Sequence, residues 1–206
     1  MNRKKFLSLF LVFLLLLGIS GCGSKTNNTI KTDSVVIAVG SEPETLDPTQ
    51  GWGHGNSPIV QSTLVKYTAD LNFENDLASG YELSADGLTW IFTLRDDAYF
   101  TDGEKVKASD VAFTLETAKA AQSAVDLTYM KSVSAKDDAT VVIKLSKPTS
   151  IFLNTLASVG IVPEHAYGED YGRNPIGSGP YKLVEWKEQE QLLFSKRKLL
   201  RQSACD

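Results

Sequence analysis

The residues best suited to chemistry lie together in one glycine-rich segment, Gly51-Trp52-Gly53-His54-Gly55-Asn56. Glycine has no side chain to keep a neighbour away, so three glycines around an aromatic ring and an imidazole indicate a backbone that approaches another molecule closely. Trp52 could stack on a solute, Gly53 could offer its backbone amide, and His54 could coordinate a metal ion. The alternative is that Trp52 packs into the protein and His54 is a surface loop residue.

No arrangement typical of an enzyme accompanies this segment. The chain has no Gly-x-Ser-x-Gly elbow, no His-Glu-x-x-His motif and no paired catalytic carboxylates. Its two histidines, His54 and His165, lie far apart, and we expect His165 to belong to a structural turn. Gly177-Ser178-Gly179 does not predict a phosphate loop, because Pro180 and a strand follow it instead of a helix. We predict no catalytic residues, no cofactor and no metal site of the protein's own, with His54 as the one possible metal ligand.

The N-terminus resembles the export signal of a bacterial lipoprotein. Three basic residues precede an apolar segment, 6–17, that is too short to span a bilayer, so residues 1–21 are predicted to be a signal peptide. Small residues then lead to Cys22, as in a lipobox, where the cysteine is acylated. We expect Cys22 to be the lipidation site, anchoring the protein outside the cytoplasm at the outer face of the membrane or in the periplasm. Residues 22–33 are then a flexible tether.

Charge and cysteine content narrow the partners further. Loss of the signal peptide, which carries three basic and no acidic residues, makes the chain more acidic than its formal net charge of -4. Binding to phosphates needs clustered cations, and the one cluster is Lys196-Arg197-Lys198, so no nucleic acid partner is expected. With Cys22 lipidated, Cys205 has no partner for an internal disulfide, and the fold must depend on its core.

Strands and helices are both predicted, without strict alternation. The apolar run at 35–40 predicts a buried strand, and Ser57-Pro58 predicts the start of a helix that continues to about Tyr67. Ser109 is expected to cap a helix from Asp110 to Ala121, with a stripe formed by Ala112, Leu115 and Ala118. Further expected elements are a strand with Trp90, Phe92 and Leu94 facing the core, a hairpin around 133–145, a short helix near 150–157 and a last strand pair at 179–186 and 191–194.

Three motifs, in order along the chain, carry a family resemblance. They are Glu44-Thr45-Leu46-Asp47-Pro48, the long stretch 78–111, and Pro175-Ile176-Gly177-Ser178-Gly179-Pro180-Tyr181-Lys182-Leu183. The long stretch contains Ser84-Ala85-Asp86-Gly87-Leu88-Thr89-Trp90. With these motifs the chain resembles family 5 of the extracellular solute-binding proteins, the peptide, dipeptide and nickel receptors of ABC importers.

The resemblance implies a fold, a site and partners. The fold is α/β, in the sense of mixed α+β: a type II periplasmic-binding-protein-like fold, with an inserted antiparallel sheet lobe at about 70–170 in a solute-binding domain at 34–194. In peptide-binding relatives, residues just beyond the Leu-Asp-Pro turn line the cleft, which places Trp52, Gly53 and His54 against the ligand. The implied partners are a small peptide or nickel chelate as solute, ABC permease and ATPase subunits, and the membrane through the lipid anchor. The protein is expected to be a monomer.

One departure from the family and two alternatives accompany this hypothesis. Relatives are more than twice as long and close a second large domain around the solute, whereas residues 195–206 do not resemble the segment that follows in the family. We therefore expect a truncated chain with an aberrant tail at 195–206, an incomplete fold and weak solute binding. The alternatives are a nickel or metal-chelate receptor of the same family and a non-transport surface lipoprotein for signalling or adhesion.

Overall fold

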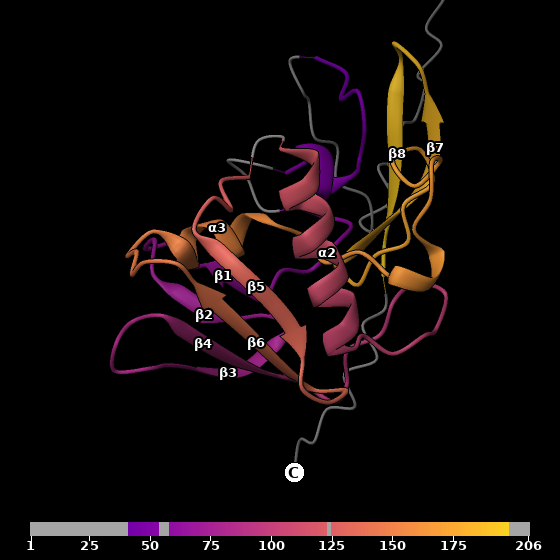
Figure 1. Ribbon diagram of the computed structural model, residues 1–206. Coiled ribbons are helices and arrows are strands. Elements are labelled where there is room, and N and C mark those ends of the chain that lie inside the picture. The colour runs from indigo at the N-terminus through magenta and orange to yellow at the C-terminus, as the bar shows by residue number, and fades with distance from the viewer. Residues whose placement is uncertain (1–40, 54–57, 123–124, 198–206) are drawn as a thin grey trace, which may run out of the picture. The chain divides into compact units, whose positions relative to one another are not determined.

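The computed structural model describes residues 41–53, 58–122 and 125–197 (Figure 1). Several of the predictions made above concern residues outside these ranges. They are the signal peptide, Cys22, the tether, the strand at 35–40, Cys205 and His54. No helix within the described ranges is long and apolar enough to cross a bilayer.

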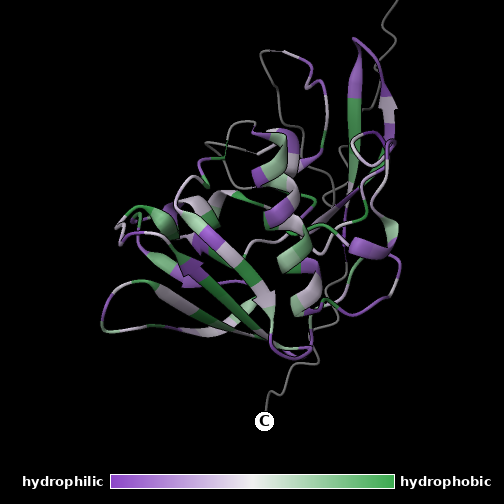
Figure 2. Cartoon of the chain, in the orientation of Figure 1, coloured by the Kyte–Doolittle hydropathy of each residue, from purple (hydrophilic) through white to green (hydrophobic). Residues whose placement is uncertain are grey.

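A four-stranded antiparallel sheet organises the middle of the chain. Its strands in spatial order are β3 (Ala78–Leu83), β4 (Thr89–Leu94), β6 (Thr140–Leu145) and β5 (Met130–Ala135). Trp90, Phe92 and Leu94 are buried, and Phe92 lies opposite Val141 of β6. The predicted inward face of this strand is therefore confirmed. Figure 2 shows hydrophobic residues along the strands of the sheet and hydrophilic residues in the turn that joins β5 to β6.

Asp-Gly pairs form two turns of this region. The Gly87 N–H donates to the Ser84 carbonyl at 2.8 Å, and the Gly103 N–H donates to the Phe100 carbonyl at 3.2 Å. Both glycines have positive φ angles, 70° and 97°, which glycine adopts without steric cost. The backbone conformation therefore favours glycine at both turns.

Helix α2 (Ala108–Ala121) packs against the sheet, chiefly against β5 (Figure 1). The predicted cap at Ser109 is wrong, because the helix already begins at Ala108. The Asp110 carboxylate accepts the Lys107 N–H at 2.8 Å and so satisfies a donor at the helix start that a cap residue would otherwise serve. Leu115 lies on the buried face as expected.

Two short helical segments follow the sheet. Helix α3 (Phe152–Ser158) confirms the short helix predicted near 150–157, and its Phe152 packs against Trp90 with ring centroids 6.3 Å apart. The 3-10 helix η3 (Glu164–Ala166) contains His165. The expectation that His165 belongs to a structural turn is therefore confirmed.

The helix predicted from Ser57-Pro58 to Tyr67 is wrong. Residues 58–64 are irregular, and β1 (Val65–Tyr67) pairs with β2 (Phe73–Asn75) as a short antiparallel hairpin. The carbonyls that a helix would use accept N–H groups from distant segments instead: those of Val60, Ser62 and Thr63 accept from Gly179, Ile161 and Leu77 at 2.8 to 2.9 Å. Tertiary hydrogen bonds thus override the local helix-start signal.

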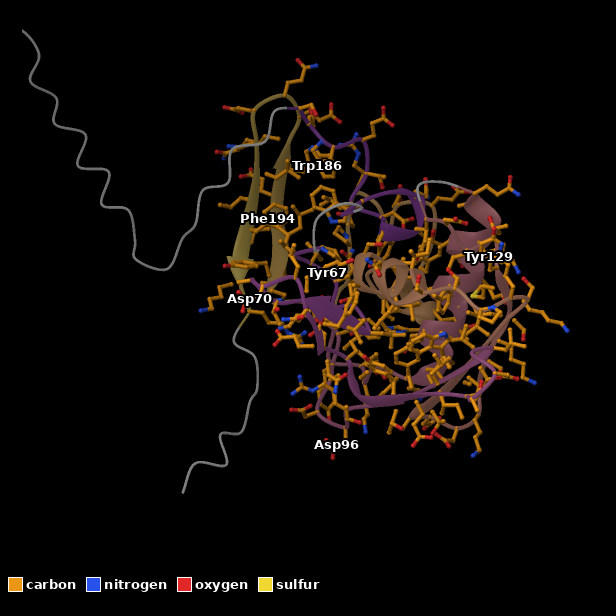
Figure 3. The ribbon with its side chains drawn as sticks, turned by 90° about the vertical axis from the view of Figure 1, so that its left-hand side faces the viewer. Tyr67, Asp70, Asp96, Tyr129, Trp186 and Phe194 are labelled. Carbon is orange, nitrogen blue, oxygen red and sulfur yellow. The ribbon has the colours of Figure 1, made fainter. Side chains whose placement is uncertain are left out.

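The last described elements form a hairpin of β7 (Tyr181–Lys187) and β8 (Gln191–Lys196), which confirms the predicted strand pair. β8 continues to Lys196, beyond the expected end at Phe194. The hairpin joins the preceding segment through the Tyr181 N–H, which donates to the Ile59 carbonyl at 3.1 Å. Figure 3 shows Trp186 and Phe194 on this hairpin. Together these elements confirm the mixed α+β class.

Candidate functional site

The Leu-Asp-Pro motif forms a rigid turn around a buried carboxylate. Asp47 is 1% exposed and precedes the 3-10 helix η2 (Pro48–Gln50). Its Oδ1 accepts the Thr49 N–H at 2.9 Å and the Thr49 hydroxyl at 2.8 Å, and its Oδ2 accepts the Gln50 Nε2 at 3.0 Å and the Tyr167 hydroxyl at 2.8 Å. No lysine or arginine of the described segments pairs with this carboxylate, so hydrogen bonds alone compensate its burial.

This turn carries Trp52 and Gly53. The Trp52 N–H donates to the Asp47 carbonyl at 3.0 Å, and Gly51 and Gly53 have φ angles of 123° and 81°. A side chain on Gly53 would put its Cβ 3.0 Å from the Cβ of Pro58, so glycine is required both by the backbone conformation and by the close approach. Trp52 is half-buried, and its indole N–H has no acceptor within the described residues.

Pro58 links the turn to the segment that follows α3. A Cβ on Gly160 would lie 3.1 Å from the Pro58 Cγ and 2.5 Å from the Gln61 Cβ. Gln61 in turn donates from Nε2 to the Leu46 carbonyl at 3.1 Å, at the start of the turn. The structure therefore keeps Trp52 and Gly53 on one turn, and Pro58 lies between Gly53 and Gly160. His54, the third predicted site residue, lies outside the described residues.

His165 makes its contacts with another part of the protein. Its Nε2 lies 2.7 Å from the Asp102 Oδ2, and its ring packs edge-on to Phe100 at 6.1 Å. Burial acts to raise the pKa of Asp102, but hydrogen bonds from His165 and from the Glu104 N–H outweigh it and leave that pKa below its ordinary value. Within residues 41–53, 58–122 and 125–197, no three His, Cys, Asp or Glu residues gather as a metal-ligand group.

Two surface hollows lie in the described part of the chain, and Pro58, beside Gly53, lines the second of them. One, of about 460 Å³, follows the β7–β8 hairpin, where the Arg173 guanidinium lies 4.1 Å over the Trp186 ring and the Trp186 indole donates to Glu42. The other, of about 290 Å³, lies between Thr63 and Arg95. Trp52 and Gly53 line neither of these two hollows.

Sequence reasoning missed the residues that hold the turn. Asp47 belongs to the Leu-Asp-Pro motif, but nothing in the sequence links it to Tyr167. An aspartate followed by proline and threonine is itself a signal for a capped turn, because the carboxylate can accept the threonine N–H and hydroxyl. The remote Tyr167 leaves no such local signal.

Comparison with known proteins decides the family. Residues 72–199 match the family described as "Bacterial extracellular solute-binding proteins, family 5 Middle". The chain belongs to family 5 of the bacterial extracellular solute-binding proteins. A family 5 protein is a binding receptor, so the chain is not an enzyme.

Relatives and solved structures agree with this assignment. The glutathione-binding protein GsiB of Salmonella typhi is 36% identical over 166 residues, which is 75% of this chain and 32% of that protein. The structure of NikZ from Campylobacter jejuni with Ni(L-His) has a TM-score of 0.71 and 32% identity and covers 80% of this chain and 35% of that one. The oligopeptide-binding protein AppA from Bacillus subtilis, solved with a nonapeptide, has a TM-score of 0.67 and 27% identity and covers 76% and 35%.

These matches confirm the predicted type II periplasmic-binding-protein fold for the part of the family that the chain covers. The chain spans about a third of the length of the curated relatives it matches. Family 5 proteins are extracellular or periplasmic, in agreement with the predicted location outside the cytoplasm.

Proposed function

We propose that this chain acts in solute capture for an ABC importer and that its solute is a small peptide. The family assignment supports the receptor role, and a glutathione-binding relative and an AppA structure with a nonapeptide support a peptide. The partners are then the permease and ATPase subunits of the importer. The protein works as a monomer, anchored outside the cytoplasm by a lipid on Cys22.

The observation that carries this proposal is the turn at 51–53. Its backbone is held by the buried Asp47, and Trp52 lies on it between two glycines with positive φ angles. An extended peptide can add its backbone to such a segment while one of its side chains packs on the half-buried Trp52 ring. A surface that is already ordered loses little entropy on binding, which favours affinity.

A nickel chelate is the second candidate solute. The observation in its favour is the likeness to NikZ, which was solved with Ni(L-His). A metal inside an organic chelator needs few protein ligands, so Trp52 could stack on the chelator and His54 could complete the coordination.

Calorimetric titration of the purified chain tests the proposal. Short peptides and glutathione should bind weakly, and Trp52→Ala should weaken binding further, by about tenfold or more, as expected for removal of an aromatic anchor. Trp186→Ala is the matched control, because Trp186 is also half-buried but lies on the β7–β8 hairpin. The assigned site is contradicted if both variants lose the same peptide affinity, or if Trp52→Ala leaves peptide affinity unchanged. Saturation by Ni²⁺ with histidine, in place of peptide, would favour the second candidate.

A further inference from the structure

One of the hydrogen bonds to the Asp47 carboxylate comes from a donor far away in sequence. The Thr49 and Gln50 donors belong to the same turn, two and three residues away in sequence. The Tyr167 hydroxyl comes from a segment 120 residues later and donates to Oδ2 at 2.8 Å. Local donors can order the turn within itself, whereas Tyr167 joins the carboxylate to another part of the protein.

Tyr167 is itself held on two sides. Its ring packs edge-on to Phe113 of α2, with centroids 5.2 Å apart, and lies 5.2 Å from the ring of Tyr171. Upstream, the Glu164 N–H donates to the buried Asp110 of α2 at 3.0 Å. The phenol is therefore a fixed donor whose position is set by the first half of α2.

Asp47 connects Tyr167 to the turn that carries Trp52 and Gly53. Its carbonyl accepts the Trp52 N–H at 3.0 Å, while its carboxylate accepts the Tyr167 hydroxyl. Both acceptors belong to one residue, so a shift of the Asp47 backbone away from Tyr167 also moves the hydrogen bond that holds Trp52. Burial raises the pKa of Tyr167, and the phenol stays protonated as a donor at neutral pH.

We propose that Tyr167 is a positioning residue for solute binding: through Asp47 it fixes the turn that presents Trp52 and Gly53. This inference rests on the proposed function, because it assigns Tyr167 a part in that same site. It assigns no contact between Tyr167 and solute. Through Tyr167, the contacts of α2 then affect the position of the turn at 51–53.

Tyr167→Phe tests the proposal, with Tyr171→Phe as the matched control. Tyr171 is 3% exposed, and its hydroxyl contacts Gln61 and the Ile176 carbonyl rather than Asp47. Tyr167→Phe should speed hydrogen exchange at the Trp52 amide and weaken peptide binding, each by about tenfold. Tyr171→Phe keeps the ring that packs against Tyr167 and removes only the hydroxyl, so it should lower the melting temperature at least as much and leave both readings near wild type. A merely structural role predicts the reverse, with Tyr171→Phe causing the larger change at Trp52.

A second variant keeps the test decisive if Tyr167→Phe folds poorly. Gln50 is exposed and donates to the same Oδ2, so Gln50→Ala removes a local donor and leaves the remote one. Gln50→Ala should change the exchange rate of the Trp52 amide less than threefold, which corresponds to less free energy than one hydrogen bond to a charged group contributes. A larger change would show that local donors hold the turn, and it would overturn the proposal. If Tyr167→Phe speeds exchange while Trp52→Ala leaves peptide binding intact, the assignment of the binding surface to Trp52 fails and the positioning of the turn by Tyr167 stands. If Trp52→Ala weakens binding and Tyr167→Phe changes neither reading, the positioning role fails alone.

Discussion

Replacing Gly177 with alanine should destabilise the protein more than a single methyl group suggests. A Cβ at this position would lie 2.0 Å from the Val60 carbonyl oxygen and 2.6 Å from its carbonyl carbon. That oxygen also accepts the Gly179 N–H at 2.8 Å, and Val60 is fully buried. The obstructing atoms are backbone, so relief requires that the two segments separate and that their hydrogen bond weakens.

The expected cost follows from these contacts. Overpacking a filled interior costs about 1–3 kcal/mol, and leaving a buried backbone group without its partner costs about as much. We expect a loss of about 3 kcal/mol in the free energy of unfolding. For a chain of this size that corresponds to a fall of roughly 6–12 °C in melting temperature.

Thermal unfolding followed by circular dichroism measures this effect, with Gly168→Ala as the control. Gly168 has open space around its missing side chain and no positive φ, so its substitution should be neutral or slightly stabilising. The reasoning is refuted if the two variants melt within a degree or two of each other. Such a result would mean that the segment at 177 does not approach Val60 as described.

Three further predictions concern the lobe. Phe92→Ala should cost about 3–5 kcal/mol in urea unfolding because Phe92 is fully buried, whereas the exposed Ile91→Thr should cost little. Asp110→Ala should cost about 1–3 kcal/mol, measured in the same way, because two backbone N–H groups lose their shared acceptor. Asp102→Asn should be destabilising at neutral pH, with a difference from wild type that shrinks as pH falls below about 4. The pKa of Asp102 lies below its ordinary value, so its pairing with His165 stabilises the fold above that value and is lost on acidification; a difference that grows in acid would contradict this.

The fold was predictable where one physical rule governed a whole segment. The alternation through Trp90, Phe92 and Leu94 fixes which face of β4 is buried, because side chains in a strand alternate between its two faces. The turns at Gly87 and Gly103 depend on an equally local rule, because glycine adopts a positive φ angle without steric cost. In each case the residues that carry the signal are also those that make the interaction.

Prediction failed where distant residues decide. The Ser57-Pro58 signal was genuine as a local preference, but N–H donors from later segments take the carbonyls that a helix would have used. The predicted site shows the same division: the glycines around Trp52 indicated an exposed backbone, whereas its link to Tyr167 depends on a contact 120 residues away. No local pattern encodes such a contact, so the support of the site emerges only from the structure.

The most direct test of the solute-binding surface is a peptide titration followed through the three tryptophan indole N–H signals. Trp90 is buried in the lobe and the Trp186 indole donates to Glu42, so both report on regions away from the 51–53 turn. The account predicts that added peptide shifts the Trp52 signal, identified by its loss in Trp52→Phe, and leaves the other two in place. A saturable shift confined to Trp186 or Trp90, with Trp52 unchanged, would contradict it.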